Sequence, residues 1–205
     1  MDDQAISTPR HRPAGEISLE TLFLDARTRN AWLPRAMDDD TIRELYELLR
    51  WPPTAANSNP ARFVFVRTEE GKERLKPHLS AGNVDKTMAA PCCVIICRDT
   101  QFFELLPELF PARDMRTPFA ANAALAEETG RRNATLQGGY LIMAARALGL
   151  DAGPMSGFNA GTLDADFFPD GRWKSEFLCN IGYGSHENLF PRNPRLAFEQ
   201  ACQLL

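Results

Sequence analysis

The chain has 205 residues, of which 44% are hydrophobic and 24% charged. These proportions are typical of a soluble globular protein with a sizeable core. The net charge of −4 and the pI near 5.5 argue against a nucleic-acid partner or an acidic membrane surface. No run approaches the about 20 apolar residues that span a bilayer, so we expect no membrane partner.

The cysteines and the N-terminus predict a cellular compartment. Segment 1–12 is polar and lacks the apolar core of an export signal, and we expect 1–17 to be a flexible tail before a single domain over 18–205. The five cysteines form no C-x-x-C pair, and four lie in apolar runs, as buried thiols do. We therefore expect a cytoplasmic protein. The three histidines are isolated, so no metal site is predicted.

The first third of the chain predicts two helices and a strand. Ser18 can cap a short helix that runs toward Asp25. Apolar residues at helical spacing predict a second helix after 39–40, which ends at the Trp-Pro-Pro sequence 51–53. The β-branched and aromatic run 62–67 predicts a strand.

The middle third contains the longest predicted helix. Helical patterns cover 69–79 and 84–89, and the almost wholly apolar run 92–97 predicts a strand covered on both faces. Aromatic residues and prolines predict an irregular excursion over 102–119. A helix follows over 122–148, and its adjacent glycines 138 and 139 predict close approach of a partner helix or a ligand.

The last third predicts an open backbone segment and a tail. Two glycines and a proline over 153–157 leave little side-chain bulk, so this segment can approach a flat ligand. A short helix over 162–168 and a strand over 177–183 follow. The tail from Pro191 is too short to fold alone and must pack against something. Long helices around a few apolar strands predict a layered α/β or α+β sandwich.

Two polar segments and part of the tail suggest a site for an anionic ligand. The segment 27–30 combines two guanidiniums with a hydroxyl and an amide, which suit phosphate oxygens, although a solvated helix end would look the same. The small polar loop 52–60 can bond a ring edge or a sugar-like chain, or it is a simple turn. Arg192 and Arg195 offer further cations, or a charged terminus.

Taken in order, these segments resemble the nitroreductase family of FMN-dependent oxidoreductases. The resemblance covers about 19–205, and the motifs that carry it are 25–28, 51–62, 71–75, 145–151, 153–158 and 180–184. It implies an α+β, three-layer α/β/α sandwich with a central mixed, mostly antiparallel sheet flanked by helices. It also implies a homodimer that exchanges its C-terminal extension. Within the family, the chain resembles the malonic semialdehyde reductases of pyrimidine degradation.

The resemblance assigns FMN contacts residue by residue. Ser156 stands where many members have an acidic residue, and Asn30 stands where many have a basic one. The loop with Pro53 comes from the second protomer in many members. The implied FMN-binding residues are Arg27, Thr28, Arg29, Pro53, Thr54, Asn57, Asn83, Lys86, Asn133, Pro154, Met155, Ser156, Gly157, Arg192 and Arg195.

The implied reaction is ping-pong hydride transfer from NADH or NADPH through flavin N5 to a small aldehyde, malonic semialdehyde, which yields 3-hydroxypropionate. The flavin carries the electrons, so no catalytic side chain is predicted. Arg116 is the candidate clamp for a substrate carboxylate, although solvated surface charge is the more common reason for such an arginine. Two other functions stay open: a broad reductase of nitroaromatics or quinones, and a flavin-binding protein without turnover.

Overall fold

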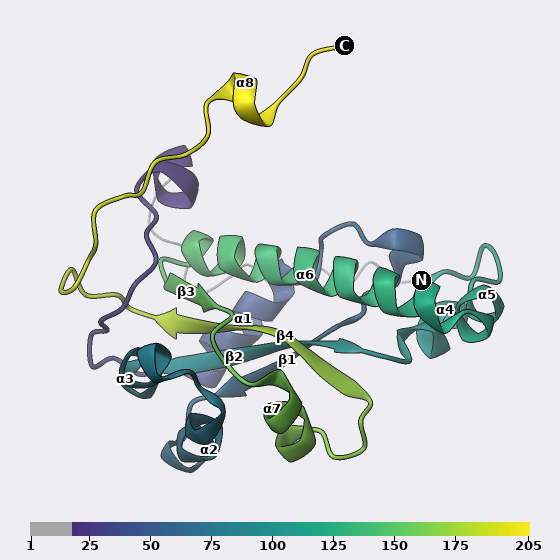
Figure 1. Cartoon of the computed structure of the whole chain (residues 1–205), viewed down its shortest axis with the longest axis horizontal. Helices are drawn as coiled ribbons and strands as arrows, with labels where there is room; N and C mark the ends of the chain where they lie inside the picture. Colours follow the sequence, from purple (N-terminus) through teal and green to yellow (C-terminus); the bar gives the residue numbers. More distant parts are fainter. Residues whose placement is uncertain (1–17) are drawn as a thin grey trace.

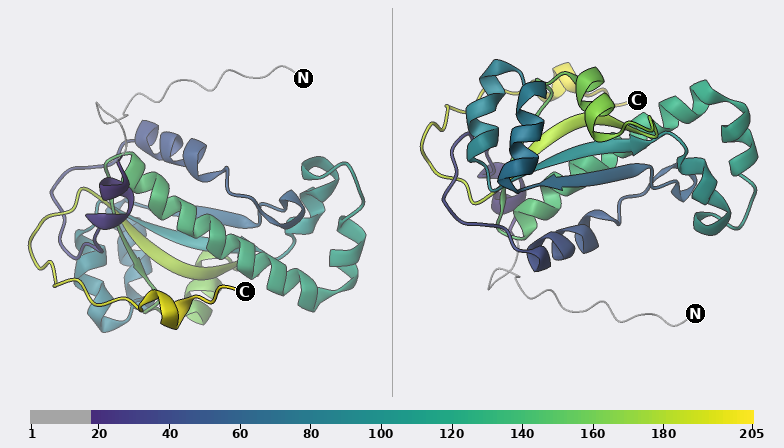
Figure 2. Two further views of the ribbon diagram at one scale, coloured as in Figure 1. Left: turned by 90° about the horizontal axis from the view of Figure 1, so that it is seen from above. Right: turned by 90° about the horizontal axis from the view of Figure 1, so that it is seen from below.

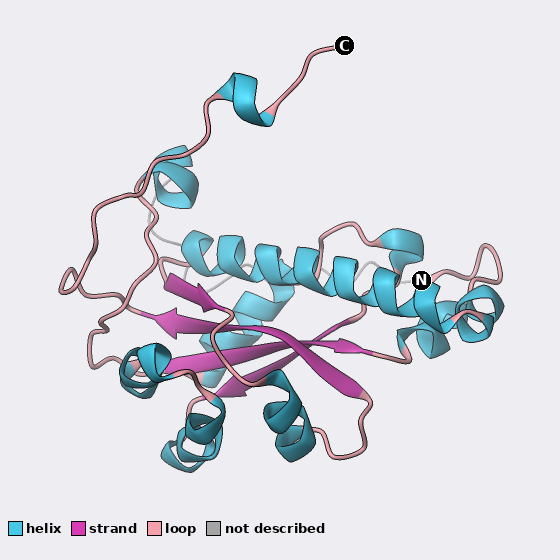
Figure 3. Ribbon diagram, in the orientation of Figure 1, coloured by secondary structure: helices cyan, strands magenta, loops and turns pink. Residues whose placement is uncertain are grey.

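A computed structural model describes residues 18–205, so the tail predicted over 1–17 lies outside the described residues. Four strands pair antiparallel in the order β1-β2-β4-β3 (Figures 1 and 3). An isolated parallel bridge joins Thr28 to Ala152 at the β3 edge, which makes the sheet mixed. The strands are β1 Ala61–Val66, β2 Cys92–Asp99, β3 Asp151–Met155 and β4 Trp173–Gly182.

Helices cover both faces of the sheet. In the two views of Figure 2, α1 and α6 lie over one face, and α2, α3 and α7 lie over the other. The α-helices are α1 Asp39–Leu49, α2 Glu69–Leu75, α3 Ala81–Ala89, α4 Leu106–Leu109, α5 Arg116–Ala121, α6 Ala123–Ala147, α7 Ala160–Phe167 and α8 Phe198–Ala201. Short turns of π or 3₁₀ type are η1 Glu20–Leu24, η2 Ala55–Asn57, η3 Lys76–His78 and η4 Phe102–Leu105. The predicted three-layer α+β sandwich is confirmed.

The apolar strand β2 explains the two cores. Successive side chains of a strand point to opposite faces, so an unbroken apolar run serves both layers. Cys92, Val94 and Ile96 belong to the core beneath α1 and α6, and their three neighbours face the core beneath α2 and α7. Burial raises the pKa of the Cys92 thiol to about 12, so this thiol stays neutral and packs as a small apolar group.

Helix α6 matches its prediction closely, because its start signal is local. The Asn122 side chain accepts a hydrogen bond from the Leu125 N–H at 3.0 Å, which caps the helix. A Cβ on Gly138 would lie 2.5 Å from Cζ of Phe177, whereas one on Gly139 would meet nothing within 4 Å. The close approach at Gly138 is therefore to the sheet, not to a helix or ligand as predicted.

The excursion over 102–119 is mostly helical, which corrects the prediction of irregular structure. It contains η4, α4 and the start of α5, and Pro107 lies in the first turn of α4, where a missing N–H costs nothing. Its aromatic side chains form a third small core with α6, around Phe102, Leu106, Phe119 and Ala126. The aromatic residues thus stabilise the helices of this segment by packing against α6, and the local sequence pattern does not reveal this packing.

The C-terminal extension leaves the body of the molecule after β4 and ends in the short helix α8 (Figure 1). Its large apolar side chains are exposed, among them Phe190, Leu196, Phe198 and Leu204. Within residues 18–205, this extension thus offers apolar surface without a covering layer. Over the same residues, no helix has the length and apolarity to cross a membrane.

Candidate functional site

Ten of the predicted FMN contacts gather at the β3 edge of the sheet, in a region that we call the β3 half-site. The bridge from Thr28 to Ala152 brings the N-terminal segment against β3. The Trp32 indole N–H donates to the Lys86 carbonyl at 3.1 Å, which ties the same segment to α3. The ten residues are Arg27, Thr28, Arg29, Asn83, Lys86, Pro154, Met155, Ser156, Gly157 and Arg192.

Two guanidiniums of the β3 half-site, those of Arg27 and Arg192, have only backbone partners among the described residues. Arg192 donates to the carbonyl oxygens of Leu24 and Ala26, the latter at 3.2 Å, and Arg27 donates to the Phe190 carbonyl. Over the described part of the chain, no carboxylate forms an ion pair with either group. Both cations therefore keep their charge available for an anion, because backbone carbonyls do not neutralise it.

A third arginine of the β3 half-site forms an ion pair within the chain. Arg29 forms an ion pair with Asp151, with 3.0 Å between Nε and Oδ1, and only 12% of its side chain is exposed. The other oxygen of Asp151 accepts the Gly184 N–H at 3.1 Å. This geometry joins the start of β3 to the end of β4, so the predicted contact of Arg29 with a phosphate stays a prediction.

Arg146 adds charge that the sequence argument missed. It lies at the end of α6 and donates to the Leu22 carbonyl at 2.8 Å. Burial lowers the pKa of the Arg146 guanidinium, and the nearby charge of Arg192 lowers it further, although nearby acidic groups act in the opposite direction. The signal available in the sequence was one basic residue in the last turn of a long helix, which is common.

The segment 153–157 is open, as its composition predicted. Pro154 and Ser156 are exposed, whereas Met155 is buried against the core beneath α2 and α7. A Cβ on Gly153 would lie 2.9 Å from the Arg29 carbonyl oxygen, so glycine is required for the N-terminal segment to reach β3. The Gly157 carbonyl accepts the Asn83 side-chain amide at 2.7 Å.

The other predicted contacts form a second region, the α6 half-site, which contains Pro53, Thr54, Asn57 and Asn133. The buried Asn133 side chain accepts the Ala55 N–H at 2.9 Å and donates to the Thr129 carbonyl at 2.8 Å. Asn57 donates to the Leu109 carbonyl at 2.8 Å, which joins the loop to α4. Both side-chain amides therefore form hydrogen bonds within the chain.

The loop of the α6 half-site has a strained backbone. Ala56, Asn57 and Asn59 have φ values of +51°, +49° and +41°. Such values are uncommon for residues with a side chain, and asparagine tolerates them better than alanine. Strain of this kind, about 1 kcal/mol or more per residue, persists only where surrounding contacts impose it and is frequent at ligand sites.

The two half-sites lie at opposite edges of the sheet. The loop 52–60 leads into β1, and Thr28 pairs with β3, at the two ends of the strand order. Along α6, Asn133 and Arg146 are separated by about 20 Å, from 1.5 Å per helical residue. Figure 1 shows η1 beside one end of α6 and α5 beside the other. The segments that the sequence grouped into one site therefore do not meet within one chain.

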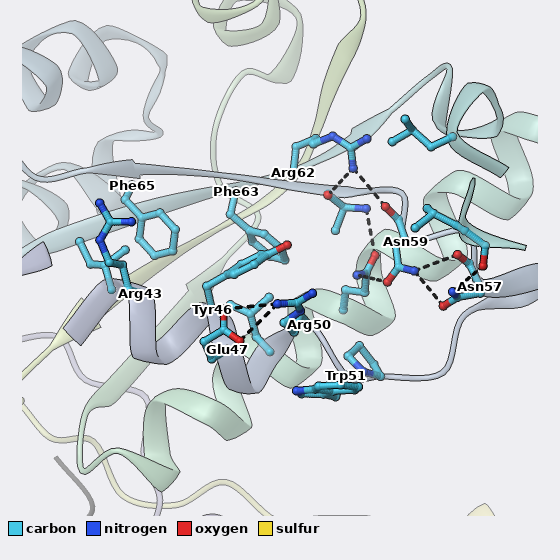
Figure 4. Close-up of a pocket in the computed structure, with 17 residues that line it drawn as sticks. Arg43, Tyr46, Glu47, Arg50, Trp51, Asn57, Asn59, Arg62, Phe63 and Phe65 are labelled. Carbon is cyan, nitrogen blue, oxygen red and sulfur yellow. Dashed lines mark hydrogen bonds and ion pairs between the residues drawn. The ribbon is translucent and has the colours of Figure 1, made fainter. Parts of the chain in front are cut away.

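A groove of about 910 Å³ lies between α1, β1 and the loop before β1 (Figure 4). Its walls carry the aromatic rings of Tyr46, Trp51, Phe63 and Phe65. The Arg50 guanidinium lies 5.7 Å from the centre of the Tyr46 ring. Because β1 is an edge strand of the sheet, an extended segment can lie beside it in this groove.

Two other predicted cations make their contacts with residues outside the two half-sites. Arg116 forms an ion pair with Glu104 at 3.1 Å, and 49% of its side chain is exposed. Arg195 donates only to the adjacent carbonyls of Asn193 and Pro194 among the described residues. Their roles as substrate clamp and phosphate contact stay predictions. Over residues 18–205, no cluster of three or more His, Cys, Asp or Glu residues is arranged to hold a metal ion.

Comparison with known proteins identifies the class of protein. The model of the nitroreductase family matches residues 27–183. A protein of Rhodopseudomonas palustris (strain TIE-1), described as a candidate NADH dehydrogenase/NAD(P)H nitroreductase, is 66% identical over 91% of this chain and 95% of its own length. A similarly described protein of Ralstonia nicotianae (strain GMI1000) is 54% identical over 91% of this chain and 96% of its own length.

A solved structure supports the same fold. The crystal structure of a candidate nitroreductase in complex with FMN, from Exiguobacterium sibiricum 255-15, has a TM-score of 0.83 and 19% identity. The match covers 95% of this chain and 100% of that one. The chain belongs to the nitroreductase family, a family of oxidoreductases.

Proposed function

We propose that this protein is an FMN-dependent NAD(P)H oxidoreductase that works as a homodimer. One observation carries the proposal: Arg27 and Arg192, which have no acidic partner among residues 18–205, lie beside an open glycine-containing backbone segment. Cations that no carboxylate neutralises attract a phosphate, and a backbone segment without side-chain bulk admits a flat ring. The name of the 66% identical relative includes an NAD(P)H-dependent activity, which agrees with this function.

FMN fits the β3 half-site by chemistry. Arg27, Thr28 and Arg192 would hold the phosphate, since guanidinium and hydroxyl groups suit its oxygens. Lys86 and Asn83 would face the polar edge of the ring, and segment 154–157 would lie over it. When bound, FMN accepts and donates hydride, and the protein supplies position and charge. A cation such as Lys86 favours the negative charge that a reduced flavin carries.

Dimerisation would bring two complementary half-sites together. A second copy can place its α6 half-site against the β3 half-site of the first. Leu136 and Tyr140, exposed on α6, and the open space over Gly139 suit close packing of another helix. We further propose that the C-terminal extension, with exposed Phe198 and Leu204, lies in the groove beside β1 of the partner.

For the acceptor, we propose malonic semialdehyde, which would yield 3-hydroxypropionate. Its support is the resemblance of the motifs to that branch, and Arg116 is the proposed clamp for its carboxylate. The second candidate is a broad reductase of nitroaromatics or quinones, which the names of the two relatives favour. The third, a flavin-binding protein without turnover, draws on Ser156 in place of an acidic residue.

The absorption spectrum of the purified protein tests the cofactor. We expect a flavin spectrum with about one FMN per chain, bleaching with NADH or NADPH under anaerobic conditions, and the mass of a dimer. A protein that binds no added FMN would refute the proposal. Bleaching too slow for turnover would favour the third candidate, a flavin-binding protein without turnover.

Steady-state rates separate the two acceptors. We expect kcat/KM for malonic semialdehyde to exceed that for a nitroaromatic, and Arg116→Ala to raise KM for the carboxylated aldehyde alone. The reverse preference would establish the nitroaromatic reductase.

A further inference from the structure

The carbonyl of Gly157 receives two hydrogen bonds from one segment of the chain. The Asn83 side-chain amide donates to it at 2.7 Å, and the Ser80 backbone N–H donates to it at 3.0 Å. Both donors belong to the start of α3. A carbonyl with both lone pairs engaged by an ordered helix end is fixed in direction.

The same segment holds the residues that follow Gly157. The Asn159 N–H donates to the His78 carbonyl at 2.8 Å, and an isolated bridge pairs Leu79 with Phe158. His78 in turn contacts α7, with 2.9 Å between its Nδ1 and the Thr162 hydroxyl. The segment 78–83 therefore holds the segment 157–159 in place through backbone and side-chain hydrogen bonds.

The constraint on residue 157 comes from the Asn83 side chain beside it, not from backbone conformation. Gly149 and Gly171 have φ values of +74° and +71°, but Gly157 is not among the glycines with positive φ. A Cβ at 157 would lie 2.5 Å from Nδ2 of Asn83 and 3.4 Å from Ser80. An alanine at 157 would thus displace the Asn83 amide and break its hydrogen bond.

We propose that Asn83 is a positioning residue that fixes the peptide between Gly157 and Phe158, and that the absence of a Cβ at Gly157 admits the Asn83 amide. The Phe158 N–H of this peptide donates to the Ser156 carbonyl at 3.1 Å and so holds the preceding peptide as well. That preceding peptide carries the Gly157 N–H, which has no acceptor among the described residues and is free for a ligand. With the side-chain Nδ2 engaged, Asn83 also presents Oδ1 as an acceptor. The proposal rests on the proposed function, with FMN as the ligand.

A double-mutant cycle tests the pairing, because coupled residues give non-additive effects. We expect Asn83→Ala and Gly157→Ala each to weaken FMN binding about tenfold, the cost of one buried hydrogen bond. The double variant should bind about as weakly as either single one, since the alanine at 157 no longer meets the amide. A double variant weakened about a hundredfold would overturn the proposal and show that Gly157 serves the ring independently.

Asn159→Ala is the matched control, because the Asn159 side chain caps α7 at the far end of the same segment, through the Thr162 N–H at 3.1 Å. It should lower stability but leave the FMN Kd and the flavin absorption bands as in the native protein. Asn83→Ala should reduce the band shift that FMN shows on binding, which a general loss of stability would not do. Equal spectral effects of the two variants would refute a positioning role.

Urea unfolding of the FMN-free protein provides a second measure of the same cycle. Coupling in unfolding is expected even if FMN is not the ligand, because the hydrogen bond belongs to the protein alone. Failure of the native protein to bind FMN, with coupling intact, would refute the proposed function but not the pairing. Additive unfolding effects would refute the pairing itself.

Discussion

The two half-sites differ in how their polar side chains are engaged within the chain. In the α6 half-site, the amides of Asn57 and Asn133 are engaged by the chain's own backbone. In the β3 half-site, Arg27 and Arg192 contact carbonyl oxygens but no acid in the described structure. The first region is internally satisfied and strained, and the second retains uncompensated charge. The difference indicates that one half shapes a ligand's surroundings, whereas the other supplies the binding charge.

The largest expected effect is loss of the binding charge. Arg27→Ala and Arg192→Ala should each weaken FMN binding roughly tenfold or more, and the double variant about a hundredfold, because charge-assisted hydrogen bonds exceed neutral ones. Isothermal titration with FMN and with riboflavin, which lacks the phosphate, measures this. Equal losses for the two ligands would show that the arginines do not bind the phosphate.

Asn133→Ala tests whether the α6 half-site is chiefly structural in the free chain. It leaves the Ala55 N–H without its acceptor, and we expect a loss of about 1–3 kcal/mol in the free energy of unfolding. Thr135→Ala, at an exposed position of the same helix, is the control and should change stability little. Urea denaturation without FMN is the measurement. A native-like stability for Asn133→Ala would contradict the expected role.

The adjacent glycines of α6 separate packing within the chain from packing between chains. Gly138→Ala should destabilise the fold by about 1–3 kcal/mol, because its Cβ would overlap Phe177. Gly139→Ala should stabilise the isolated chain by up to about 1 kcal/mol through helix propensity. If a partner helix packs at Gly139, the same change raises the dimer dissociation constant. Sedimentation equilibrium at several concentrations decides between these outcomes.

The smallest expected effect concerns the support of the β3 half-site. The hydrogen bond from His78 holds the pKa of the Asp166 carboxyl below its usual value of 3.8, with Arg74 adding to this. A carboxyl with a lowered pKa stabilises the fold above its unfolded pKa, and this contribution is lost as pH falls through the folded pKa. The stability difference between native protein and Asp166→Asn should therefore be constant near neutral pH and shrink in acid. A stability difference that stays constant down to low pH would contradict the expected stabilisation by the Asp166 carboxylate.

Local signals explain which elements could be predicted. The cap at Asn122 and the break after Leu49 depend on neighbouring residues, so α6 and α1 match their predicted bounds closely. The strand β4 begins at Trp173, before the predicted start at 177, because its first residues pair with β2 beyond a bulge after Ile96. The helices within 102–119 were missed because packing against α6 stabilises them. Neither the pairing of β4 with β2 nor the packing of 102–119 against α6 produces a periodic pattern in the sequence.

The sequence by itself determined the family, the layered fold and the residue types suited to a phosphate. Motif order, apolar periodicity and side-chain chemistry depend only on which residues occur and in what order. Only the tertiary structure decided which of those residues are available. It paired Arg29 with Asp151, left Arg27 and Arg192 without an acid among residues 18–205, and placed the two half-sites at opposite edges of the sheet. The physical reason is that a charge or an amide acts on a ligand only if no group distant in sequence has already engaged it.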